Sequence, residues 1–114
     1  MIEQHLRSSL RDVMVELIEL ADAYRAVRYR TSRGHLHPPG DLLYGVASLD
    51  RLCEFLLAHP GLAAGSDEED FLDSVVYVDV VLGRGATAPT DLTVLADFEE
   101  AFTIVVQLFN RLAL

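Results

Sequence analysis

Basic side chains gather in one short stretch of this otherwise acidic chain. Four of its nine basic residues fall within nine positions, and two histidines follow: Arg25, Arg28, Arg30, Arg33, His35 and His37. Guanidinium groups bind carboxylates and phosphates, and imidazole exchanges protons near neutral pH. On a helix, Arg25, Arg28 and Tyr29 share a face, and with Arg33 they form a candidate patch for an anion or an acidic partner. Alternatively, these arginines favour the C-terminal end of a helix dipole and pair with acids on neighbouring helices.

The spacing of Arg30 from His35 and His37 resembles the R-x4-6-H pattern of the HEPN ribonucleases, which are helical-bundle proteins and often dimers. This resemblance implies a ribonuclease or toxin in which Arg30 acts with His35 or His37. In that family an Asn or Asp commonly follows the arginine, whereas Thr31 follows it here.

A second, shorter resemblance begins at His37. The stretch HPPGDLLY resembles the turn before the third helix of the colicin DNase immunity proteins, which are small acidic helical inhibitors. Eight residues carry this likeness, and it assigns no role to any of them.

Negative charge dominates the second half of the chain. The formal net charge is −9, and the chain from Gly61 onward contains ten acidic residues but only two arginines. Phosphate neutralisation supplies most of the affinity of proteins for nucleic acids, so this half argues against direct nucleic-acid binding. A basic surface on a protein partner would be attracted to it.

The run SDEED places four consecutive acids at the expected start of a helix. Ser66 and Glu69 match the S-x-x-E capping box, and acids in a first turn favour the positive end of the helix dipole. Four acids exceed that need, because like charges one turn apart repel. We therefore take the surplus acids, with others nearby, as candidate partner-binding residues: Asp67, Glu68, Asp70, Asp73, Glu99 and Glu100.

Apolar residues recur at spacings of three and four along most of the chain, which predicts four amphipathic helices. We expect them to run from Leu6 to about Thr31, from Asp41 to His59, from Ser66 to a stop at Gly83 and Gly85, and from about Thr90 to Leu112. Residues 75–82 are rich in valine and also fit a strand, but the capping box and the apolar spacing favour a helix.

These helices predict an all-α fold, an antiparallel four-helix bundle formed as a single domain by residues 1–114. Apolar positions outside the narrow stripes suggest a homodimer or other homo-oligomer: Ile2, Ile104, Val106 and Leu108. Cys53 lies on a core stripe and reads as a small apolar residue. Asp79 lies beside a stripe among valines, so we expect it to pair with an arginine or a hydroxyl group.

Convergent catalytic residues, a metal-binding spacing and a cofactor motif are not found in the sequence, so we expect no metal and no cofactor. The start of the chain does not read as a secretory signal, and no apolar run reaches membrane-spanning length. With its lone cysteine, this composition predicts a cytoplasmic protein.

The favoured function is that of a small acidic, non-enzymatic protein-binding module: an inhibitor, an immunity-type protein or an adaptor subunit. The HEPN-like ribonuclease is one alternative, and a purely structural oligomer subunit is another.

Overall fold

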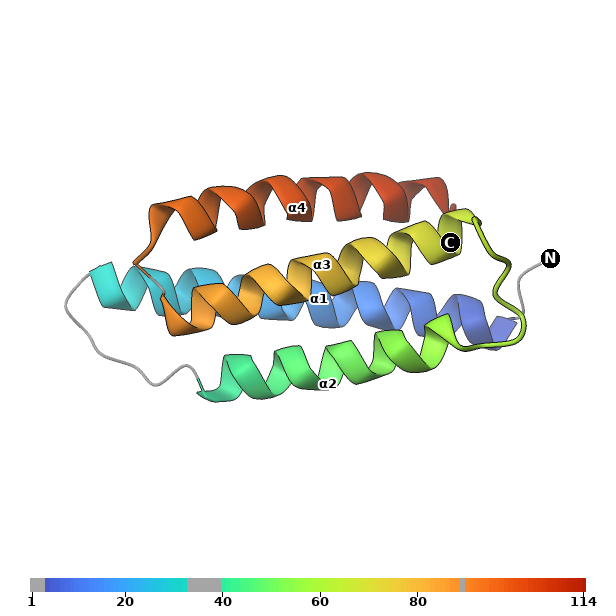
Figure 1. Ribbon diagram of the computed structural model, residues 1–114, viewed down its shortest axis with the longest axis horizontal. Coiled ribbons are helices and arrows are strands. Elements are labelled where there is room, and N and C mark those ends of the chain that lie inside the picture. Colours follow the sequence, from blue (N-terminus) through green and yellow to red (C-terminus); the bar gives the residue numbers. More distant parts are fainter. Residues whose placement is uncertain (1–3, 33–39, 89) are drawn as a thin grey trace.

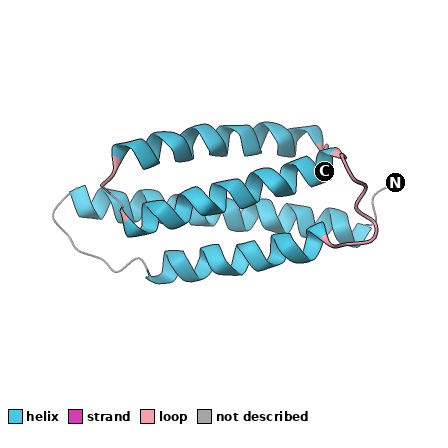
Figure 2. Cartoon of the chain, in the orientation of Figure 1, coloured by secondary structure: helices cyan, strands magenta, loops and turns pink. Residues whose placement is uncertain are grey.

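The computed structural model describes residues 4–32, 40–88 and 90–114, without the side chains of residues 27–32, 40 and 41. The regular structure in these ranges is entirely helical (Figure 2). The helices are α1 (Gln4–Ser32), α2 (Gly40–Leu57), α3 (Asp67–Thr87) and α4 (Leu92–Arg111). Successive helices run in alternating directions, so the predicted antiparallel all-α bundle is confirmed (Figure 1). Residues 75–82 are helical, which resolves the ambiguity of the valine-rich run.

The helix α3 lies at the centre of the bundle. It packs against α1, α2 and α4, and its contacts with α2 and α4 are the most extensive in the fold. The molecule is elongated, with extents of 50 × 22 × 18 Å, because all four helices lie nearly side by side (Figure 1). The buried face of α3 therefore supports the core and the edges of that face form seams with the neighbouring helices, while the opposite face of α3 is exposed.

The apolar stripes predicted for α1 and α3 are buried as expected. Their buried members include Leu6, Leu10, Val13, Leu17 and Tyr24 on α1 and Phe71, Val75, Val78 and Leu82 on α3. On α4 the apolar spacing predicts a stripe of Leu95, Phe98, Phe102, Val105, Phe109 and Leu112, and the buried face is rotated from it. Its buried residues are Val94, Phe98, Ala101 and Val105, whereas Leu95, Phe102 and Phe109 are only partly buried against the core.

The end predicted for α3 is wrong. Gly83 and Gly85 lie inside the helix, which continues to Thr87. Gly85 permits a close helix contact, because a Cβ atom there would lie 2.5 Å from Cε1 of Tyr24 on α1. This glycine therefore serves packing between helices and does not terminate one.

The start of α4 lies slightly later than predicted. Asp91 is the N-cap, and its Oδ1 accepts hydrogen bonds from the backbone N–H groups of Thr93 at 2.9 Å and Val94 at 3.4 Å. An acid at this position satisfies donors that the first turn leaves unpaired.

Candidate partner-binding surface

The first turn of α3 uses one of its four acids in a cap. The Ser66 hydroxyl accepts a hydrogen bond from the Glu69 N–H at 3.2 Å, and the Glu69 carboxylate accepts one from the Gly65 N–H at 3.1 Å. Gly65 has a φ of +75°, which glycine adopts without steric cost. The Ser66 half of the predicted capping box is thus present, whereas the Glu69 carboxylate bonds to the Gly65 N–H in place of the Ser66 N–H. Among the four acids, Glu69 alone uses its side chain in this cap.

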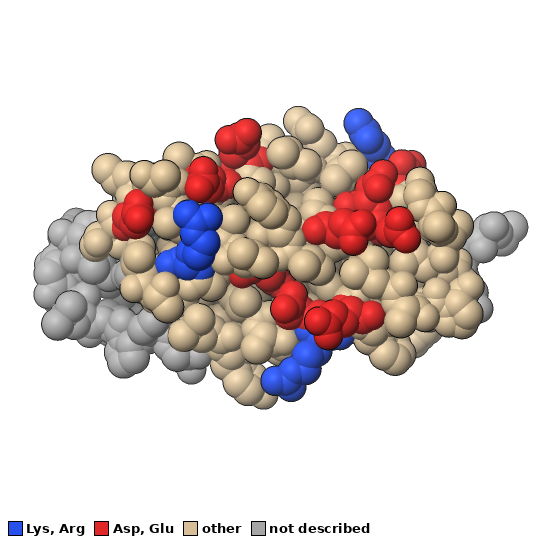
Figure 3. Space-filling model, in the orientation of Figure 1, with Lys and Arg blue, Asp and Glu red and all other residues tan. Residues whose placement is uncertain are grey.

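The other acids at this end of α3 face solvent. Asp67, Asp70 and Asp73 are exposed and Glu68 is half-buried. None of the four has an ion-pair partner within the described part of the chain. Acidic side chains form separate groups on the face shown in Figure 3, including one over the N-terminal half of α3 and one over the N-terminal half of α4, at opposite ends of the bundle. The structure thus brings four of the six predicted partner-binding acids together on one stretch of α3.

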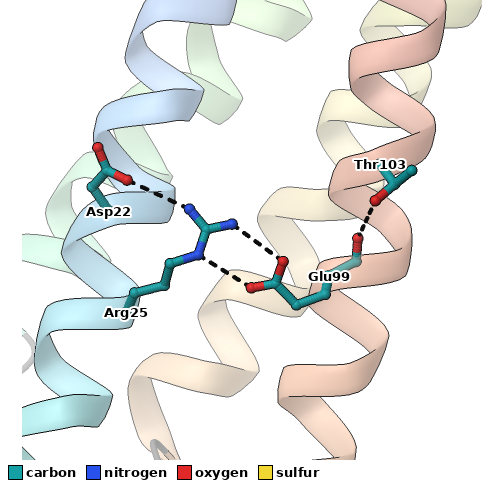
Figure 4. Close-up of polar contacts among 4 residues, drawn as sticks. All are labelled: Asp22, Arg25, Glu99 and Thr103. Atoms are coloured by element: carbon teal, nitrogen blue, oxygen red, sulfur yellow. Dashed lines mark hydrogen bonds and ion pairs between the residues drawn. The ribbon is translucent and has the colours of Figure 1, made fainter.

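The two α4 acids of the predicted set differ in their surroundings. Glu99 is held by Arg25 of α1, whose Nε and Nη2 donate to the two carboxylate oxygens at 3.1 and 3.2 Å (Figure 4). Glu100 is exposed and has no ion-pair partner in the described regions. The Glu99 carboxylate is therefore occupied within the fold, whereas that of Glu100 remains open to a partner.

Arg25 joins α1 to α4 by more than its bond to Glu99. Its Nη1 also donates to Asp22 at 3.4 Å, and its guanidinium carbon lies 5.5 and 5.4 Å from the ring centroids of Phe98 and Phe102. The hydrogen bond to Glu99 raises the pKa of Arg25 above its usual value. The expectation that an arginine of the basic stretch pairs with acids of a neighbouring helix is confirmed for this residue.

The rest of the basic stretch cannot be placed in a site. Arg28, Tyr29 and Arg30 belong to α1, but their side chains lie outside the described set, and residues 33–39 are not described at all. The anion patch and the HEPN-like set of Arg30, His35 and His37 therefore stay predictions.

A carboxyl group without a partner lies inside the bundle. Asp79 on α3 is 1% exposed, and neither of its carboxylate oxygens has a hydrogen-bond partner among the residues described. The expected pairing with an arginine or a hydroxyl is therefore wrong for this part of the chain. Burial raises the pKa of Asp79 to about 8, and the negative charge of Asp50 on α2 adds to the rise. Such a group is mostly protonated at neutral pH, which removes the cost of burying a charge.

Cys53 is fully buried on α2, as predicted. Burial raises the pKa of its thiol to about 12, with smaller contributions from the charges of Asp79 and Asp50. A thiol with so high a pKa carries almost no thiolate at neutral pH, so this cysteine acts as a packing residue.

A groove along the seam of α3 and α4 was not predicted from the sequence. It has a volume of about 290 Å³ and is lined by Tyr77, Asp97, Glu100, Ala101 and Ile104. Asp97 also forms an ion pair with Arg84 at 3.7 Å, between two half-exposed side chains. In the sequence, Tyr77 interrupts the polar face of α3, and this is the feature that could have indicated the groove.

Comparison of the chain with protein-family models, curated proteins and solved structures found no significant match. The class of the protein therefore rests on its architecture, an all-α antiparallel four-helix bundle. Within the described ranges, no helix combines the length and apolarity needed to cross a membrane. No three histidine, cysteine or acidic side chains in those ranges are grouped as metal ligands would be.

Proposed function

We propose that this protein is a non-enzymatic protein-binding module, of the inhibitor, immunity-type or adaptor kind, that attracts a basic surface of a partner protein. The proposal rests on the exposed acids of α3, which exceed the need of its N-terminal cap and lack ion-pair partners in the described chain. Glu100 is a further exposed acid, on α4. Glu99 lies beside it, with its carboxylate bound to Arg25.

The expected consequence is fast association that weakens as salt is added. Complementary charges steer encounter and raise association rates, and salt screens interactions between exposed charges that lie more than about 8–10 Å apart at ordinary ionic strength. The partner would be recovered by affinity capture on the immobilised protein and identified by mass spectrometry. Its association rate would then be measured by stopped flow over a range of salt concentrations.

A matched pair of triple variants separates this surface from net charge. The test variant carries Asp67→Asn, Asp70→Asn and Asp73→Asn, leaving Ser66 and Glu69 intact. The control carries Asp12→Asn, Glu16→Gln and Glu19→Gln on α1, where all three acids are also exposed. Association should slow much more in the test variant than in the control. Equal rates for the wild type and the test variant at every salt concentration would refute the proposal.

Self-association is a second part of the proposal. Of the four residues expected at a dimer interface, Ile104 is exposed, Val106 and Leu108 pack partly against the core, and Ile2 lies outside the described residues. A better-supported surface lies on α2, where Tyr44 and Phe55 are largely exposed three helical turns apart on one face. Light scattering should give a molar mass greater than that of one chain, and Phe55→Ala should lower this mass. A monomer at all concentrations would refute this part.

A further inference from the structure

The groove between α3 and α4 differs in kind from the acidic surface at the start of α3, because much of its lining is apolar. Tyr77 of α3 and Ile104 of α4 both line it and are 57% and 47% exposed. Val80, one turn after Tyr77 on α3, is 59% exposed. Single exposed apolar side chains are ordinary, but a contiguous group with a polar border is typical of an interaction site.

Carboxylates border this apolar group on both sides along the seam. The exposed ridge of α3 is formed by Asp73, Tyr77, Val80 and Arg84, at the spacing of one helix face. Asp73 precedes Tyr77 by one turn. Asp97 pairs with Arg84, about two turns beyond Tyr77, so it lies on the opposite side of the apolar group.

The bordering charges are available to an incoming cation. Glu100 is exposed and no described residue forms an ion pair with it, and the same holds for Asp73. Asp97 and Arg84 are both half-exposed and 3.7 Å apart, and exposed pairs of this kind contribute only about 0–1 kcal/mol. A partner's cation can therefore exchange for Arg84 at little cost.

We propose that this groove receives a basic amphipathic helix of the partner protein, whose apolar side chains contact Tyr77, Val80 and Ile104 and whose arginines or lysines pair with the bordering acids. The inference rests on the proposed function, and it adds the chemistry that the partner presents. Helices bind through grooves of this kind by residues spaced three and four apart. An arginine can also stack on the exposed Tyr77 ring, where a cation and an aromatic face attract each other.

Charge complementarity selects this occupant over a second copy of the chain. The protein has twice as many acidic as basic residues, so a neighbouring copy would bring further carboxylates to a groove already bordered by them. The described residues contain no strand that could pair with an extended segment. A groove between two antiparallel helices is instead completed by a third helix lying along it.

The test uses a fluorescein-labelled helical peptide in which leucines occupy one face and arginines flank them. A control peptide has the same composition, with leucines and arginines scattered around the helix. Binding is measured by fluorescence anisotropy, and the site on the wild-type protein is mapped by amide chemical shifts. We expect the amphipathic peptide to bind more tightly than the control and to shift amides of residues 77–84 and 97–104.

Substitutions in the protein then separate the groove from other apolar surface. Tyr77→Ala together with Ile104→Ala should weaken binding of the amphipathic peptide by at least about tenfold. Val15→Ala shortens a comparably exposed apolar side chain on α1, 55% exposed, and should leave binding unchanged. Circular dichroism establishes that each variant remains helical. If the groove variant does not fold, the shift map on the wild-type protein decides the question.

Three results would overturn the inference. If the groove substitutions leave the peptide affinity unchanged while Asp67→Asn with Asp70→Asn weakens it, the groove is not the site but the proposed function survives. If the peptide does not bind the wild-type protein at low salt, the groove lacks this specificity, and the native partner's association rate decides the proposed function separately. If Tyr77→Ala converts an oligomer into a monomer, the groove is a contact between copies of this chain.

Discussion

Replacing Asp79 with asparagine should change the way in which the free energy of unfolding depends on pH. Burial, with a smaller effect of Asp50, raises the pKa of Asp79 from 3.8 to about 8. Between these two values the folded chain keeps a proton that the unfolded chain releases. Protein stability rises with pH only where the unfolded state binds more protons, so here the free energy of unfolding falls as the pH rises.

The size of the effect follows from the shift in pKa. Each pH unit between the two values removes up to about 1.4 kcal/mol, so the loss from pH 5 to pH 7 is roughly 2–3 kcal/mol. Total stabilities of proteins are about 5–15 kcal/mol, so this is a large fraction. Asparagine has nearly the shape of the protonated acid and does not titrate. The advantage of Asp79→Asn over the wild type should therefore widen by roughly 2–3 kcal/mol over the same range.

Urea unfolding followed by circular dichroism at several pH values between 5 and 8 would measure this difference. Asp73→Asn is the matched control, because Asp73 is an exposed acid on the same helix. Its stability should follow the wild-type dependence on pH closely. Parallel curves for the wild type and Asp79→Asn would show that Asp79 titrates normally, and the account of its burial would be wrong.

Two further predictions concern contacts of α1 with its neighbours. Gly85→Ala should destabilise the fold by about 1–3 kcal/mol, because its Cβ would lie 2.5 Å from a ring carbon of Tyr24. A Cβ at Gly83 would have no neighbour within 4 Å, so Gly83→Ala should stabilise α3 by up to about 1 kcal/mol. If the two substitutions shifted the melting temperature in the same direction, the close contact at Gly85 would be contradicted. A double-mutant cycle with Arg25→Ala and Glu99→Ala should give a coupling energy of about 0.2–1 kcal/mol that decreases at high salt. Zero coupling at low salt would mean that this bridge does not contribute to stability.

Local patterns in the sequence were sufficient to predict the four helices. A capping residue and a buried stripe are properties of one segment, so Ser66 with Glu69 identified the start of α3. The stripe of that helix, beginning at Phe71, outweighed the preference of its valines for a strand. A helix can therefore be predicted from the sequence where a capping residue and the spacing of apolar residues both indicate it.

Contacts between helices could not be predicted from such local patterns in the sequence. The sequence alone predicts a helix end at Gly85, because the packing role of this glycine depends on Tyr24, sixty-one positions earlier in the chain. The buried face of α4 was misplaced by part of a turn, since Phe102 and Phe109 are apolar but only partly buried. The α3–α4 groove also depends on how these two helices meet, so Tyr77 could not be matched with Ile104 beforehand.

The charge that a partner would meet differs from the formal value of −9. Asp79 is mostly protonated at neutral pH, which removes one negative charge from that value. The opposite charges of Glu99 and Arg25 already cancel in it, so this pair offers a partner no net charge. The uncompensated charge on the α3–α4 face is carried by exposed acids, chiefly those near the start of α3 and Glu100.

Attraction by those acids and contact with the groove should therefore affect different kinetic steps. Exposed charges act at a distance and mainly set the association rate, which salt reduces. Short-range contacts with Tyr77 and Ile104 form after encounter, so their loss should mainly raise the dissociation rate. If neutralising Asp67 and Asp70 slowed association, while Tyr77→Ala speeded dissociation without changing association, the two surfaces would act in succession on one partner.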